Sequence, residues 1–114
     1  MDSPLLHEWK NIEEKTIFPG FHARFIHSAN MTFALWDIDA GASLPEHAHP
    51  HEQVGHLLEG EFILTIAGES NVMKTGSGSC TYGFPQHLDF PETGPLPRVL
   101  GKVSNELSCM NLAS

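Results

Sequence analysis

The sequence has few basic residues and no long apolar run. Lysine and arginine together number 6 against 14 acidic residues, so the formal net charge at pH 7 is −8. A surface with this charge repels nucleic-acid phosphates and anionic lipids, so we expect neither as a partner. No apolar stretch approaches the roughly 18 residues that a membrane-spanning helix needs. The acidic balance indicates solubility and says little about the substrate.

Cysteines and targeting signals are also scarce. Cys80 and Cys109 have no metal-binding spacing. They either form one disulfide or stay as buried or idle thiols, and we favour the thiols. Residues 1–15 lack a basic region followed by an apolar core, so we expect no secretory signal and a cytoplasmic protein.

The chain is dominated by short apolar segments separated by turn residues. Pro19-Gly20, Glu59-Gly60 and residues 68–71 predict turns, and the proline-rich residues 91–97 predict a surface loop. Residues 5–15 predict a short helix or an extended lead-in. The alternating or branched segments predict strands over 21–27, 31–38, 53–58, 61–67, 72–74, 79–82, 87–90, 98–103 and 106–110.

This pattern indicates an all-β sandwich or barrel, because it leaves no room for crossover helices. No repeat or linker interrupts the sequence, so we expect one domain over residues 1–114. Residues 1–20 would form its lead-in.

Histidine is the residue in excess, with 8 in the chain, of which His47, His49 and His51 lie close together. Side chains two apart on a strand share a face, so His47 and His49 can bind one metal ion through neutral ring nitrogens. Gln53 has the same parity and would bind through its amide oxygen. His51 is the local rival, although Pro50 predicts a bend that turns it outward.

The fourth ligand must come from a distant segment, and His87 is the best candidate. It lies between Pro85 and the apolar and acidic residues 88–90, in a position to reach inward from a neighbouring hairpin. His56 is one residue out of phase with Gln53 and should face the other side of its strand.

The segment from Gly41 to Gly60 resembles the first motif of the cupins. The five positions of that motif correspond to Gly41, His47, His49, Gln53 and Gly60. Cupins usually have glutamate at the position of Gln53, and glutamine is a frequent variant.

The second cupin motif places a glycine eleven residues before a histidine, as Gly76 and His87 are placed here. Tyr82 and Phe84 replace the proline and glycine of that motif. The resemblance covers residues 31–90, the predicted core.

The resemblance implies a double-stranded β-helix, the jelly-roll barrel, with one divalent metal inside an open end. The implied ligands are His47, His49, Gln53 and His87. Zn, Ni, Fe and Mn all fit this set, and cupins of this length commonly form homodimers.

The closest functional resemblance is to the cupins that open the rings of unsaturated uronates in pectin degradation, a part of carbohydrate metabolism. It implies isomerisation or lyase chemistry on a small oxygenated metabolite, such as an unsaturated uronate or keto sugar. The alternatives are a metal-dependent dioxygenase and a non-catalytic cupin that binds a sugar or small acid. The neutral Gln53 makes the dioxygenase less favoured, because many iron oxygenases use two histidines and a carboxylate.

Other pocket residues are weaker candidates. Arg24 could bind a substrate carboxylate, but an ordinary ion pair is the more common role for such a residue. Trp36 and Phe84 could contact substrate, although aromatic residues in a barrel are usually core. Tyr82 and His56 are the candidates for proton transfer.

Overall fold

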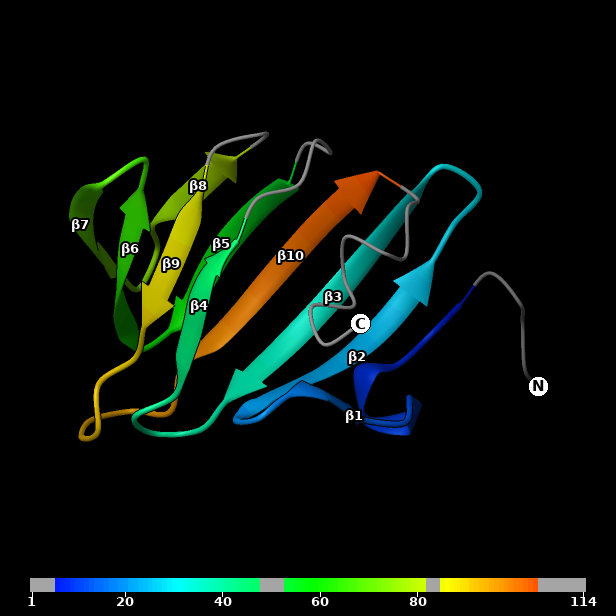
Figure 1. Ribbon diagram of the computed structural model, residues 1–114. Helices are drawn as coiled ribbons and strands as arrows, with labels where there is room; N and C mark the ends of the chain where they lie inside the picture. The colour runs from blue at the N-terminus through cyan, green and yellow to red at the C-terminus, as the bar shows by residue number, and fades with distance from the viewer. Residues whose placement is uncertain (1–5, 48–52, 82–84, 105–114) are drawn as a thin grey trace.

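A computed structural model describes residues 6–47, 53–81 and 85–104 of the chain (Figure 1). Within these ranges, the side chains of residues 47, 81, 103 and 104 are not described. The described part contains one short 3-10 helix and ten strands. It holds no helix long and apolar enough to span a membrane. The elements are η1 (Trp9–Asn11), β1 (Lys15–Phe18), β2 (Phe21–His27), β3 (Met31–Ile38), β4 (Ser43–His47), β5 (Gln53–Glu59), β6 (Glu61–Ile66), β7 (Glu69–Lys74), β8 (Gly78–Thr81), β9 (Gln86–Asp89) and β10 (Arg98–Ser104).

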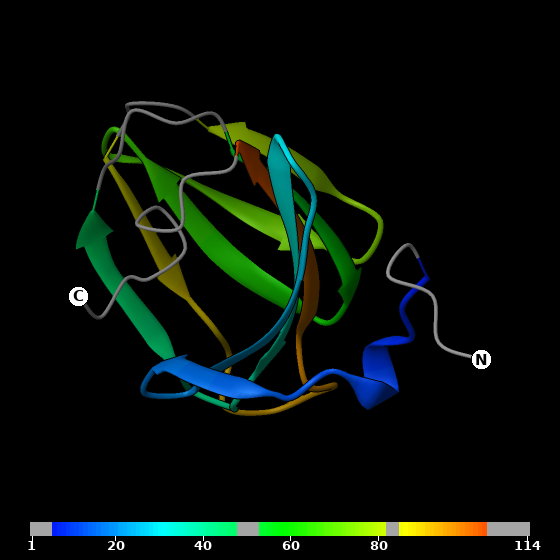
Figure 2. The same cartoon turned by 90° about the vertical axis from the view of Figure 1, so that its right-hand side faces the viewer.

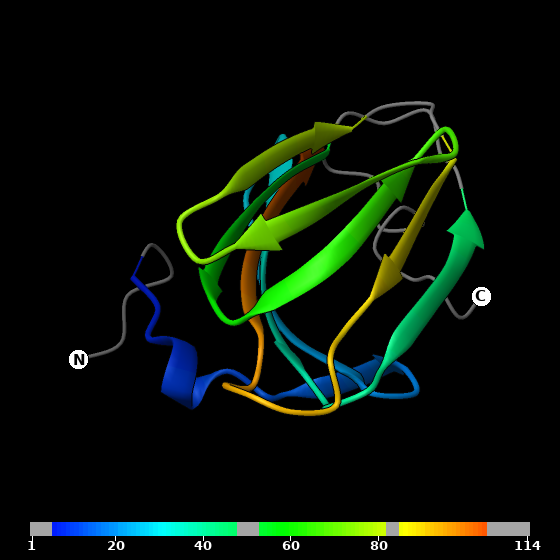
Figure 3. The same ribbon diagram turned by 90° about the vertical axis from the view of Figure 1, so that its left-hand side faces the viewer.

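The strands form two antiparallel sheets that face each other (Figures 2 and 3). One sheet has the order β1-β2-β3-β10-β5-β8, and the other has the order β4-β9-β6-β7. Strands distant in sequence are neighbours, since β10 lies between β3 and β5. The predicted all-β class is therefore confirmed.

Most strands lie where the sequence pattern predicts them. β2 and β3 have the predicted bounds, 21–27 and 31–38. β1 lies within the segment predicted as lead-in and pairs with β2, and η1 is the only helical turn in the described part of that segment. The strand predicted over 106–110 lies outside the described residues.

The hairpin between β6 and β7 is tighter than the sequence predicts. Its two central residues, Ala67 and Gly68, have φ values of 49° and 84°. Positive φ at both positions gives a turn whose twist matches that of the flanking strands. The pairing of Ile66 with Glu69 closes the hairpin there, so β7 begins three residues before the predicted residue 72.

β4 contains a register shift. Leu44 pairs with Leu88 of β9, but His47 pairs with Gln86. Three steps along β4 therefore correspond to two steps along β9, which is the geometry of a β-bulge. The bulge makes His47, and not Glu46, the partner of Gln86.

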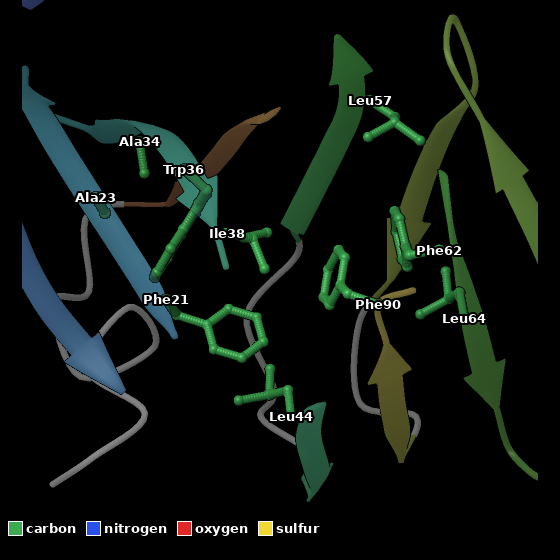
Figure 4. Packing of buried hydrophobic residues seen from close by; sticks show 10 residues of the cluster. All are labelled: Phe21, Ala23, Ala34, Trp36, Ile38, Leu44, Leu57, Phe62, Leu64 and Phe90. Atoms are coloured by element: carbon green, nitrogen blue, oxygen red, sulfur yellow. The ribbon is translucent and has the colours of Figure 1, made fainter. Parts of the chain in front are cut away.

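Aromatic rings connect the two sheets across the core (Figure 4). Phe21 of β2 packs edge-to-face on Phe90, which follows β9, with ring centroids 5.5 Å apart. Phe90 stacks on Phe62 of β6 at 4.8 Å, and Phe21 also contacts Trp36 of β3 at 6.5 Å. These offset and edge-to-face contacts bury large apolar surfaces from both sheets.

Gly60 closes the turn between β5 and β6, and its backbone has φ +93°. A Cβ at this position would lie 2.9 Å from the Cα of Pro97 and 3.3 Å from the carbonyl oxygen of Pro95. Both the backbone conformation and the close packing of the 91–97 loop therefore require glycine.

We expect Gly60→Ala to lower the free energy of unfolding by at least about 2 kcal/mol, because it adds a clash to a backbone penalty of about 1 kcal/mol. Gly68→Ala is the matched control: Gly68 has φ +84°, and a Cβ added there would have no atom within 4 Å. Urea unfolding of both variants measures the difference. Equal losses would show that the contact with Pro97 is unimportant.

Candidate functional site

A cavity of about 90 Å³ lies between the two sheets. Its walls are mostly apolar and come from strands of both sheets. The lining residues are Phe21, Trp36, Ile38, Leu44, Gln53, Gly55, Phe62, Leu64, Ser79, Gln86, Leu88, Phe90, Val99 and Gly101.

Gln53 brings a polar group into this cavity. On β5, Gln53 and Gly55 line the cavity while Val54 and His56 are exposed, as strand alternation requires. The side-chain oxygen Oε1 of Gln53 is buried and has no hydrogen-bond partner among the residues that the structure describes. An unpaired buried acceptor costs about 1–3 kcal/mol, so it points to a missing partner or a functional role.

Gln86 is the second amide in the cavity wall. It is 7% exposed and lines the cavity together with Leu88 and Phe90, its neighbours at alternate positions. Gln53 and Gln86 are the first residues of β5 and β9, and both strands begin at the same end of the molecule (Figure 1). The cavity therefore has two amides near one end and apolar side chains over most of its remaining wall.

The histidine cluster is only partly described. The backbone of His47 ends β4 at the same end of the molecule, opposite Gln86 in the register (Figure 3). His49 and His51 lie outside the described residues, as do Tyr82 and Phe84.

His87 does not line the cavity. It lies between the inward-facing Gln86 and Leu88, so its side chain is on the other face of β9. Its Nε2 atom is 2.8 Å from Oδ2 of Asp89, and Oδ1 of Asp89 accepts a hydrogen bond from Ser43 at 2.9 Å. The structure thus does not bring the predicted fourth ligand to Gln53.

Arg24 is also outside the cavity. Its Nε donates a hydrogen bond to the carbonyl oxygen of Ile12, and its Nη1 lies 3.2 Å from Glu14 and 3.6 Å from Asp37. This is the ordinary ion pair that was the alternative to substrate binding. His56 is exposed on the outer face of β5, whereas Trp36 does line the cavity.

Asp37 links neighbouring strands on the outer face of the larger sheet. It accepts hydrogen bonds from Arg98 at 2.9 and 3.4 Å, in addition to its contact with Arg24. The hydrogen bond and the charge of Asp37, with a smaller contribution from Glu59, raise the pKa of the Arg98 guanidinium. The cations near this carboxylate connect β3 to the neighbouring strands β2 and β10 and do not line the cavity.

Comparisons with known proteins agree with this architecture. Residues 34–82 match the family described as "Cupin domain". An RmlC-like cupin from Shewanella frigidimarina superposes with a TM-score of 0.83 at 20% identity, covering 95% of this chain and 96% of its own. This chain has the cupin fold.

Two further solved structures have the same fold. KdgF from Halomonas sp. superposes with a TM-score of 0.75 at 21% identity, covering 86% of this chain and 90% of its own. The polyketide cyclase RemF from Streptomyces resistomycificus gives 0.76 at 18% identity, covering 89% and 79%. At these identities the likeness concerns the fold. A comparison with curated protein sequences finds no match.

One donor at this end of the cavity suits a metal ion in its chemistry. Among the described residues no three histidine, cysteine, aspartate or glutamate side chains form a metal cluster, but the side chains of His47, His49 and His51 are not among them. The buried, unpaired oxygen of Gln53 is a neutral oxygen donor of the kind that divalent ions accept. The described donor therefore fits the expected group.

Gln86 is a buried polar residue of the cavity that sequence reasoning missed. Its signal was the alternation of Gln86, Leu88 and Phe90, which places two apolar residues and one amide on one face. Sequence reasoning selected the adjacent His87 instead, because His87 matches the histidine of the second cupin motif. Cys80, for its part, is an exposed free thiol, and Cys109 lies outside the described residues.

We expect Gln53→Met to stabilise the metal-free protein by about 1 kcal/mol, because it removes an unpaired buried acceptor and nearly conserves volume. Chemical unfolding in the presence of a chelator measures this. Gln86→Met is the matched control, since no unpaired buried atom is found on Gln86. A Gln53→Met protein less stable than the parent under these conditions would mean that the amide is satisfied in solution.

Proposed function

We propose that this cupin is a metal-dependent enzyme that acts on a small oxygenated metabolite at the open end of its barrel. The observation that carries the proposal is the buried Oε1 of Gln53, which lies in the cavity wall and has no hydrogen-bond partner within the described part of the chain. A divalent ion bound there would satisfy that oxygen, and elsewhere in the described cavity wall the polar groups are few.

The residues that would hold the ion are His47, His49 and Gln53. The register position of His47 opposite Gln86 supports this set, because Gln86 itself lines the cavity. His87 is the fourth ligand predicted from sequence. For His87 to join the set, β9 would have to slip by one residue, which would turn Gln86 and Leu88 out of the cavity.

A bound divalent ion would polarise an oxygen of the substrate and favour an anionic oxygen ligand. Its imidazole and amide ligands are neutral, so they would leave its charge uncompensated, unlike the glutamate usual in cupins. Zn, Ni, Fe and Mn all suit this donor set.

The chemistry that fits best is isomerisation or lyase chemistry, with an unsaturated uronate or keto sugar as the substrate inferred from sequence resemblance. The described cavity wall contains no side chain that could serve as an acid or base. Of the two candidates for proton transfer, His56 is exposed on the outer face of β5 and Tyr82 lies outside the described residues. A dioxygenase and a non-catalytic binding cupin are the other candidates, and the homodimer, the cytoplasmic location and the single domain stay predictions.

We expect His47→Ala and His49→Ala each to abolish stoichiometric metal binding, because each removes a direct ligand. Elemental analysis of the purified proteins measures the metal content. His56→Ala is the matched control, since His56 lies on the outer face of β5. Full metal occupancy in both ligand variants would refute the assignment, and His87→Ala shows whether the fourth position belongs to that residue.

Turnover is tested by incubating the metal-loaded protein with unsaturated uronates and keto sugars and following products by NMR. An enzyme of the proposed class forms product without consuming oxygen. Oxygen uptake during turnover would identify a dioxygenase, and tight binding without any product would identify a binding cupin.

A further inference from the structure

Aromatic side chains form much of the cavity wall beyond the amides. Phe21, Trp36, Phe62 and Phe90 all line it, and each is at most 8% exposed (Figure 4). Aromatic edges and faces pack well against flat apolar rings. We call the cavity that these rings and the two amides line the chamber, and apolar side chains form most of its wall.

The polar groups of the chamber are few and uncharged. Gln53, Gln86 and Ser79 are the polar side chains among the described lining residues, and Trp36 adds one indole N–H. No charged side chain lies among those residues, and Arg24, the cation predicted to bind a carboxylate, is held outside by Glu14 and Asp37.

We propose that the chamber takes an uncharged, largely apolar ring that carries a carbonyl or hydroxyl group, with Gln86 as the hydrogen-bonding anchor. This inference rests on the proposed function, because the metal would occupy the same end of the cavity and use Gln53. Gln86 is then the amide left free to bind the ligand. Its side chain both donates and accepts, so it can pair with either substituent.

Here the chamber departs from the substrate class that the sequence resemblance implies, because a uronate fits it less well than such a ring. Each buried hydroxyl without a partner costs free energy, and a sugar ring carries several of them. A carboxylate buried without a cation costs far more. The metal could bind one anionic group, but the described wall offers too few partners for the remaining hydroxyls.

The test uses three probes that share one ring: benzyl alcohol, toluene and benzoate. The protein carries Trp9→Phe, so that Trp36 of the chamber is its one remaining tryptophan, and a chelator keeps it metal-free. We expect benzyl alcohol to change the Trp36 emission saturably. Toluene should bind about three- to tenfold more weakly, because it lacks the hydrogen bond. Benzoate and galacturonate should give no saturable change.

Two variants locate the site. Gln86→Leu should reduce the affinity for benzyl alcohol to that for toluene and leave toluene binding unchanged. Gly101→Val should block both probes by filling the chamber, and Gly101→Ala is a milder version, since a Cβ there meets Trp36 Nε1 at an ordinary 3.5 Å. Gly78→Ala, on a residue that does not line the cavity, is the matched control.

Binding of benzoate or galacturonate as tight as that of benzyl alcohol would overturn the proposal, as would affinities unaffected by Gln86→Leu and both Gly101 variants. The metal is tested separately by adding Zn²⁺. Benzoate binding that appears only with Zn²⁺ supports the proposed function. If Zn²⁺ has no effect while benzyl alcohol still binds as described, the metal assignment fails and the chamber assignment stands.

Discussion

Burial of aromatic rings between the two sheets is the interaction on which the rest of the structure depends. Phe21 and Trp36 come from the larger sheet, Phe62 comes from the smaller one, and Phe90 contacts both Phe21 and Phe62. Because these rings must face inward, the pleat of each strand fixes the direction of every neighbouring side chain. The same alternation that buries the core therefore decides which polar residues reach the cavity.

The cavity end combines two features that a stable core avoids. One is the unpaired oxygen of Gln53, and the other is the burial of a second amide, Gln86, in a mostly apolar wall. Buried polar groups without partners lower stability, and native proteins tolerate them chiefly where function needs them. The two amides divide naturally between the proposed roles, with Gln53 directed to a metal and Gln86 to the ligand.

The outer faces carry Arg24 and His87, two residues that sequence reasoning associated with the site. Arg24, Asp37 and Arg98 form an ion-pair network across neighbouring strands, and His87 is paired with Asp89. Exposed pairs of this kind add little stability individually. Their importance here is that they leave the described cavity wall without charge, which favours a neutral ligand body over an anionic sugar.

The sequence by itself determined the all-β class, the bounds of β2 and β3, and the inward parity of Gln53, because alternation and turn residues act over a few positions. Only the tertiary structure decided that Gln86 and not His87 lines the cavity, that Arg24 lies outside it, and that a bulge sets His47 opposite Gln86. Strand register and bulges depend on pairing between distant segments, and a shift of one residue exchanges the two faces of a strand. Local pattern does not contain that information.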